Sequence, residues 1–200
     1  MMSLDETGGA IIGTVITVAI ILIGISIVSG FILHTRNTDT RASLDRLVSV
    51  INSLDDGNST VLKISMDRGA AIMGFSKNSP VILKHATGVL GMIHISHSVK
   101  SVDHPNTGVC PPDSTCLCAA SSRFFKPSYC LALNDTINNI FYDNSKKGNM
   151  KINLGMPVKG KKGLTYLVLA TTLMKSYHLL LNITKNNSEI LIYVQELKGT

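Results

Sequence analysis

The longest apolar run of the chain lies near its N-terminus, over residues 10–33, where isoleucine and valine dominate. No charged residue occurs between Thr7 and Leu33. A helix of this length, at about 1.5 Å per residue, exceeds the roughly 30 Å of a bilayer's hydrocarbon core. The run is too long, and the preceding residues too acidic, for a cleaved signal peptide. The pattern therefore predicts a transmembrane helix over 10–33 behind a short polar N-terminus over 1–9.

Small residues fall on one face of this predicted helix when it is drawn at about 100° per residue. They are Gly9, Gly13, Thr17 and Gly24. Small side chains let two helices approach closely in lipid, so this face predicts a homo- or hetero-oligomer held by the helix. The alternative is that glycine is simply more frequent in membrane helices than in soluble ones.

The segment Ile12-Gly13-Thr14, followed by Thr17-Val18-Ala19-Ile20, resembles the N-terminal helix of archaeal type IV pilins and the related archaellins. The resemblance implies a surface or filament subunit. Members of that family carry a basic residue at a processing site ahead of the helix, whereas the acidic Asp5 and Glu6 stand there in this chain.

Residues 34–57 begin with a short polar segment, after which apolar residues recur at regular intervals. The apolar positions are Leu44, Leu47, Val48, Ile51 and Leu54. Their spacing predicts an amphipathic helix, which Thr40 can cap and which Gly57 follows. The order of membrane helix, amphipathic helix and strands also resembles the pilin plan.

Residues 58–200 read as strands separated by turn signals. Strands are expected at 61–66, 71–75, 81–85, 89–99, 129–133, 140–142, 151–154, 164–174, 177–184 and 189–197. Asp67-Arg68-Gly69 predicts a hairpin between the first two, and residues 185–188 predict one between the last two. The predicted fold class is α+β and membrane-anchored, with a mostly antiparallel β domain that contains a cysteine-stapled loop region.

The four cysteines lie together in the sequence, with the spacing C-x5-C-x-C-x11-C. They are Cys110, Cys116, Cys118 and Cys130. This spacing differs from the two C-x2-C pairs of a structural zinc site, and one intervening residue makes a direct bond between Cys116 and Cys118 strained. Two disulfides that link this pair to Cys110 and Cys130, in either permutation, fit better; zinc or free thiols are the alternative.

Disulfides indicate an oxidising compartment, so the β domain is expected outside the cytoplasm, on a cell membrane crossed once. The positive-inside rule argues the opposite, because Arg36, Arg41 and Arg46 all follow the apolar run and no basic residue precedes it.

The formal net charge is +6, and the basic excess lies late in the chain. Its densest positions, here called the basic patch, are Lys146, Lys147, Lys159, Lys161 and Lys162. Such a surface attracts anionic partners, namely lipid head groups, an acidic surface polymer or nucleic acid. The alternative is a solubilising loop punctuated by glycine.

No catalytic motif occurs, so neither an enzyme nor a cofactor is expected. His94 and His97 fall on opposite faces of their predicted strand, and no carboxylate lies at a ligand-like spacing from them or from His85 and His104. These histidines are therefore interpreted as structural, and no metal site is expected. Sequons for N-glycosylation begin at Asn58, Asn134, Asn182 and Asn186.

These features together predict a membrane-anchored structural or surface protein, either a pilin-like subunit or a display protein, with lipid and other subunits as partners. The alternative is an accessory binding module that holds a partner complex or an anionic ligand through its basic C-terminal region.

Overall fold

The computed structural model describes residues 15–21, 38–87, 96–146, 154–172 and 175–199. The chain divides into two compact units, residues 1–37 and 38–200. In the first unit residues 15–21 form a helix with exposed side chains, Thr17 among them. Gly9, Gly13 and Gly24 lie outside the described residues.

The predicted transmembrane helix is the main correction. Within the described part of the chain, no helix is both long enough and apolar enough to span a bilayer. The membrane-anchored fold class, with its transmembrane helix over 10–33, is therefore wrong.

The second unit begins with helix α2 (Thr38–Ser53), which confirms the amphipathic pattern. Its buried positions are Thr40, Ser43, Leu44, Leu47, Val48 and Ile51. Thr40 lies inside the helix and does not cap its start. Its backbone N–H and its hydroxyl both donate to Asp67 Oδ2, at 2.9 and 2.8 Å.

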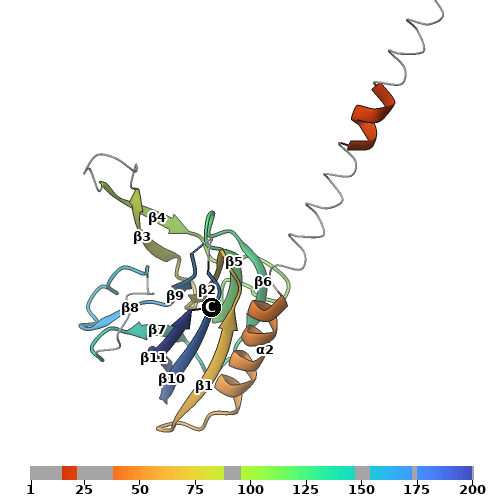
Figure 1. Ribbon diagram of the computed structural model, residues 1–200. Coiled ribbons are helices and arrows are strands. Elements are labelled where there is room, and N and C mark those ends of the chain that lie inside the picture. The colour runs from red at the N-terminus through yellow and green to blue at the C-terminus, as the bar shows by residue number, and fades with distance from the viewer. Residues whose placement is uncertain (1–14, 22–37, 88–95, 147–153, 173–174, 200) are drawn as a thin grey trace, which may run out of the picture. The chain divides into compact units, whose positions relative to one another are not determined.

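Eleven strands follow among the described residues, and antiparallel pairing dominates (Figure 1). A five-stranded sheet has the order β1 (Ser59–Met66), β10 (Tyr177–Asn186), β11 (Glu189–Gly199), β7 (Asn139–Asp143) and β8 (Leu164–Tyr166). A four-stranded sheet has the order β6 (Pro127–Ala132), β5 (Cys116–Ser121), β2 (Ala70–Phe75) and β9 (Val168–Ala170). Strands β3 (Val81–Thr87) and β4 (Ser96–Val102) pair with each other. Only β7 and β11 pair in parallel within this described set.

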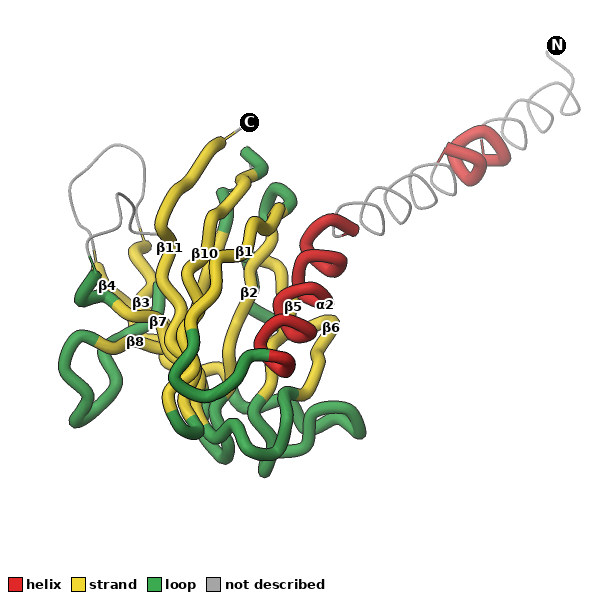
Figure 2. Tube along the Cα trace, turned by 90° about the horizontal axis from the view of Figure 1, so that it is seen from below, coloured by secondary structure: helices red, strands yellow, loops and turns green. Residues whose placement is uncertain are grey.

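The four-stranded sheet is covered on both faces. Because side chains alternate along a strand, Ile72 of β2 joins an apolar cluster shared with α2 and the five-stranded sheet, while Met73 joins a second cluster with β3. All six residues of β2 are accordingly buried. Figure 2 shows α2 on one side of the four-stranded sheet, near β1 and β6, and the β3–β4 hairpin on the other side.

The hairpin predicted at Asp67-Arg68-Gly69 is wrong, because the two strands it joins enter different sheets. Strand β1 pairs with β10, whereas β2 pairs with β5 and β9. The turn itself exists, since Ala70 N–H donates to Asp67 O. Two backbone hydrogen bonds hold Gly69 of this turn in place. Its N–H donates to Thr172 O, and its carbonyl accepts the N–H of Ser122.

The strand predicted over 164–174 also changes sheets. Residues Leu164–Tyr166 form β8 and Val168–Ala170 form β9, with the fully buried Leu167 between them. Leu167 O accepts the N–H of Gly74, so a hydrogen bond links this crossing to the C-terminal end of β2. The final hairpin is confirmed as β10 and β11, and Asn187 in its turn has a φ of 54°.

Candidate redox and metal site

The four cysteines form two disulfides, Cys110–Cys116 and Cys118–Cys130, and no cysteine is free. This is one of the two pairings that the spacing predicts. The second disulfide does not staple a loop. Cys118 and Cys130 are directly opposed on the antiparallel strands β5 and β6, with their Cα atoms 4.1 Å apart. The cysteine segment thus contains a buried central strand that the sequence analysis missed.

The first disulfide closes the loop that leads into β5. Both of its cysteines are fully buried. Backbone hydrogen bonds position this loop: Cys110 N–H donates to Thr107 O at 3.0 Å, and Asn78 N–H donates to Pro112 O at 2.7 Å. On the other side, Leu133 N–H donates to Thr115 O at 2.8 Å. None of these bonds involves the sulfur atoms, so the loop has a scaffold apart from its disulfide.

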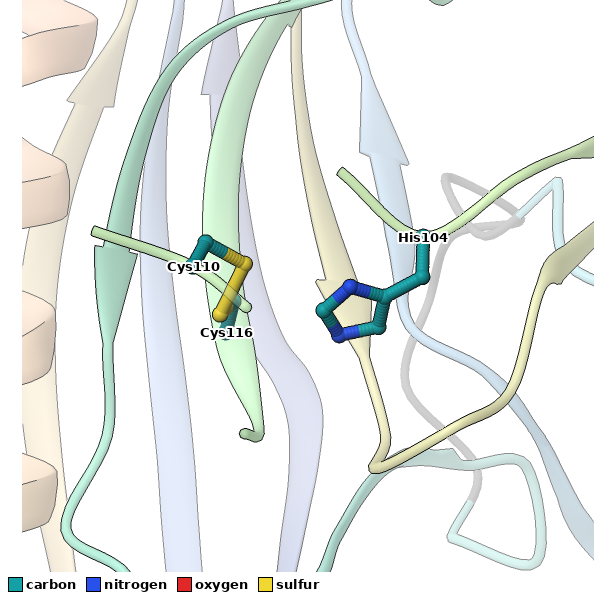
Figure 3. Close-up of side chains that lie close together, drawn as sticks. All are labelled: His104, Cys110 and Cys116. Atoms are coloured by element: carbon teal, nitrogen blue, oxygen red, sulfur yellow. A yellow bond between two sulfur atoms is a disulfide. The ribbon is translucent and has the colours of Figure 1, made fainter. Parts of the chain in front are cut away.

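His104 lies beside this disulfide (Figure 3). One ligand-type atom from each of His104, Cys110 and Cys116 can be chosen so that all three lie within 4.8 Å of one another. The imidazole meets Phe75 edge-on, with 5.5 Å between ring centroids. The hydroxyl of Ser114 lies 3.1 Å from Cys116 Sγ, so a second polar group also contacts the disulfide.

Both ring nitrogens of His104 face backbone carbonyls. Nδ1 lies 2.9 Å from Pro105 O, and Nε2 lies 2.9 Å from Ser114 O. A carbonyl only accepts hydrogen bonds, and a neutral imidazole has one N–H to donate. The neutral ring therefore satisfies one of these two contacts, and the protonated ring satisfies both.

Among the residues whose side chains are described, no further histidine joins this group. His94 lies outside the described residues. His85 and His97 belong to β3 and β4 but are opposite Ser98 and Ala86, not each other. Within the described chain, His104, Cys110 and Cys116 form the one cluster of three metal-ligand residue types. Their spacing, H-x5-C-x5-C, is the sequence signal that points to it, although it matches no common zinc pattern.

The lysines of the basic patch differ in their contacts. Lys161 forms an ion pair with Glu189 and lies over the ring of Phe141, and Lys146 lies over the ring of Tyr193. Lys147 lies outside the described residues. Lys159 and Lys162 are exposed and have no partner among the described residues.

Two consecutive β-turns present these exposed lysines. Lys161 N–H donates to Val158 O in the first turn, and Leu164 N–H donates to Lys161 O in the second. The third residue of each turn, Gly160 or Gly163, has a φ of 79°, which glycine adopts without steric cost. Lys159 and Lys162 thus occupy the same position in successive turns, and a bond from Val158 N–H to Leu164 O closes the loop.

Three of the four sequons lie at the end of the domain where α2 ends. Lys185, next to Asn186, donates its N–H to Asn58 O, and Asn134 bonds to Asn52 at the end of α2. Asn58, Asn134 and Asn186 are exposed. Asn182 instead lies half-buried within β10.

Strand β6 is attached to α2 by a polar contact. Tyr129 Oη donates to Asp45 Oδ1 at 2.8 Å, and Arg41 lies over the Tyr129 ring at 5.4 Å from its centroid. The hydrogen bond to Asp45 raises the pKa of Tyr129, burial and the Asp45 charge add to this, and Arg41 opposes it. The contact is structural.

No protein-family model, curated protein or solved structure matches this chain. The resemblance of residues 12–20 to archaeal pilins therefore stays a prediction.

Proposed function

We propose that this chain is an exported structural or surface-display protein whose β domain functions outside the cytoplasm. The observation that carries the proposal is that all four cysteines are paired as disulfides. Disulfides persist in oxidising compartments and are rare in the cytosol. The absence of a catalytic motif from the sequence favours a structural role over an enzymatic one.

The positions of the sequons support display. Asn58 and Asn186 are exposed at the end of the domain opposite the one where α2 begins. Chain outside the cytoplasm is accessible to glycosylation at such positions. A role as a pilin-like filament subunit rests on the resemblance of residues 12–20 alone, so it stays a prediction.

The test is to trap the thiols in cells that produce the protein naturally. Acid quenching followed by alkylation under denaturing conditions should leave all four cysteines unmodified, because they are paired. Reduction before alkylation is the control and should label all four. Labelling of all four without reduction would place the domain in a reducing compartment and would contradict the proposal. In the same peptide map, a glycan mass on Asn58 or Asn186 would add support.

A second candidate function is a binding module for an anionic polymer. The loop of Lys159 and Lys162 favours it, because two unneutralised cations stand at equivalent positions of a closed double turn. Charge reversal at Lys159 and Lys162, compared with charge reversal at two other exposed lysines, separates this candidate from a purely structural role.

A further inference from the structure

We infer that His104, Cys110 and Cys116 form a redox-dependent zinc site, which binds one Zn²⁺ when the Cys110–Cys116 disulfide is reduced. This inference goes beyond the proposed function and does not depend on it. It is based on the positions of one ring nitrogen of His104 and the two sulfurs of Cys110 and Cys116, which all lie within 4.8 Å of one another.

The donor set fits zinc. Two thiolates and one imidazole are ligands that Zn²⁺ prefers, and water can occupy the fourth tetrahedral position. Zinc–sulfur bonds of about 2.3 Å in a tetrahedral site place two sulfurs about 3.8 Å apart. Opening the disulfide to that separation requires movement of the two cysteine side chains but no rearrangement of the β5–β6 pairing.

The contacts of His104 prepare one nitrogen for the metal. A zinc-bound histidine usually donates its other ring N–H to a carbonyl or carboxylate, which fixes the tautomer. Pro105 O lies 2.9 Å from Nδ1 and provides this acceptor. Nε2 is then the ligand atom, and it exchanges its contact with Ser114 O for the metal.

The loop keeps its scaffold when the disulfide opens. The backbone bonds at Cys110, Pro112 and Thr115 do not use sulfur, so the two cysteines stay near His104 after reduction. The hydroxyl of Ser114 is also close enough to Cys116 Sγ to donate to a thiolate.

The two states interconvert by a balanced reaction. In the forward direction, two molecules of a small thiol reduce the Cys110–Cys116 bond by thiol–disulfide exchange and are oxidised to one small-molecule disulfide. The protein gains two thiols, whose protons leave as zinc binds. In the reverse direction, a small-molecule disulfide accepts two electrons from the two thiolates and is itself cleaved to two thiolates. The protein disulfide then re-forms and Zn²⁺ is released.

The second disulfide provides a matched control within the same chain. Cys118 and Cys130 are not part of any three-residue ligand group among the described residues. We would prepare the full chain as Cys118→Ala/Cys130→Ala, which keeps the proposed site, and as Cys110→Ala/Cys116→Ala, which keeps the other pair. Both variants would be reduced with a phosphine, which is then removed. Each would be titrated with zinc in competition with a chromophoric chelator, and in a separate experiment with cobalt.

The first variant should bind one zinc and give the thiolate-to-cobalt charge-transfer band of a tetrahedral site, and the second should bind none under the same conditions. Adding His104→Ala to the first variant should weaken zinc binding at least about 100-fold, more than loss of a supporting residue costs. His178→Ala is the control, because His178 bonds to Ser65 on β1 and not to the cysteine loop. Oxidised glutathione should release the zinc.

A wild-type measurement avoids dependence on variants that fail to fold. In the fully reduced wild-type chain, stoichiometric zinc should protect Cys110 and Cys116 from alkylation and leave Cys118 and Cys130 reactive. Equal protection of both pairs, equal binding by both cysteine variants, or affinity indifferent to His104 would each overturn the inference.

Discussion

At the scale of single residues, Tyr142 shows how burial produces a pH dependence. Its side chain lies in the main core with 5% exposure. Burial raises the pKa of Tyr142 above 10.0; a hydrogen bond with the Val194 backbone opposes this, and the charge of Asp143 adds to it. The folded chain therefore holds this proton more tightly than the unfolded chain does.

The sign of the effect on stability follows from linkage. Below about pH 9 the hydroxyl is protonated in both states, and this group causes no change. As the pH rises through 10, the unfolded chain loses the proton first, so the free energy of unfolding falls. Urea unfolding at pH 8 and pH 10.5 should show a smaller fall for Tyr142→Phe than for the wild type. An equal fall in both would contradict the assignment to Tyr142.

Residue roles that depend on distant partners were beyond the sequence analysis. Threonine is a common helix cap, so the sequence predicts that role for Thr40, but its hydroxyl donates to Asp67 on the β1–β2 corner. The sequence likewise predicts a structural role for His104, because its position beside Cys110 and Cys116 depends on how the loop before β5 folds back. The type of a residue shows which contacts its side chain can make, whereas the tertiary structure decides which partner it contacts.

At the scale of elements, the segment 154–156 joins the β3–β4 hairpin to the rest of the domain. Leu154 O accepts from Lys84 N–H of β3, and Met156 O accepts from Tyr166 N–H of β8. Gly155 between them leaves no room for a side chain, because a Cβ atom there would lie 2.1 Å from Tyr166 O.

Gly155→Ala should therefore destabilise the domain by about 1–3 kcal/mol, the usual cost of overpacking a filled site. Gly108→Ala is the matched control, since a Cβ atom at Gly108 meets nothing within 4 Å. Its effect should stay within about 0.5 kcal/mol. Chemical denaturation of the two variants beside the wild type measures both values. Equal stability of the two variants would show that segment 154–156 shifts without cost.

Elements with short-range signals were predicted well. The helical spacing from Leu44 to Ile51 gave α2, and the polar turn after Thr184 gave the β10–β11 hairpin. The failures concern which sheet a strand enters. Strands β1 and β2 diverge after Met66, and residues 164–170 divide between two sheets at Leu167. Strands β1 and β9 find their partners roughly a hundred residues or more away in the chain.

At the scale of the whole molecule, the membrane-anchored architecture was the largest error. It rests on the length of one apolar run, whereas no helix among the described residues is long and apolar enough to span a bilayer. The disulfide framework was predicted correctly, because two cysteines separated by one residue exclude each other as partners. The choice between the two pairings required the opposition of Cys118 and Cys130 across β5 and β6.

The surface charge of the whole chain makes the anionic-polymer candidate testable. The net charge of +6 alone gives weak, non-specific attraction to any polyanion. A specific site requires cations in a fixed geometry, which Lys159 and Lys162 have through their closed double turn. Lys161 contributes less, because Glu189 neutralises it.

Lys159→Glu/Lys162→Glu should therefore weaken binding to polygalacturonate by about tenfold more than a matched charge reversal elsewhere, Lys63→Glu/Lys126→Glu. Lys63 and Lys126 are also exposed and lie in β1 and just before β6, so both variants change the net charge equally. Affinity would be measured by fluorescence anisotropy at several salt concentrations. The slope of log affinity against log salt should become shallower for the loop variant, because it makes fewer ionic contacts. If both variants lose the same affinity, net charge alone accounts for binding, and the structural role stands without a dedicated anion site.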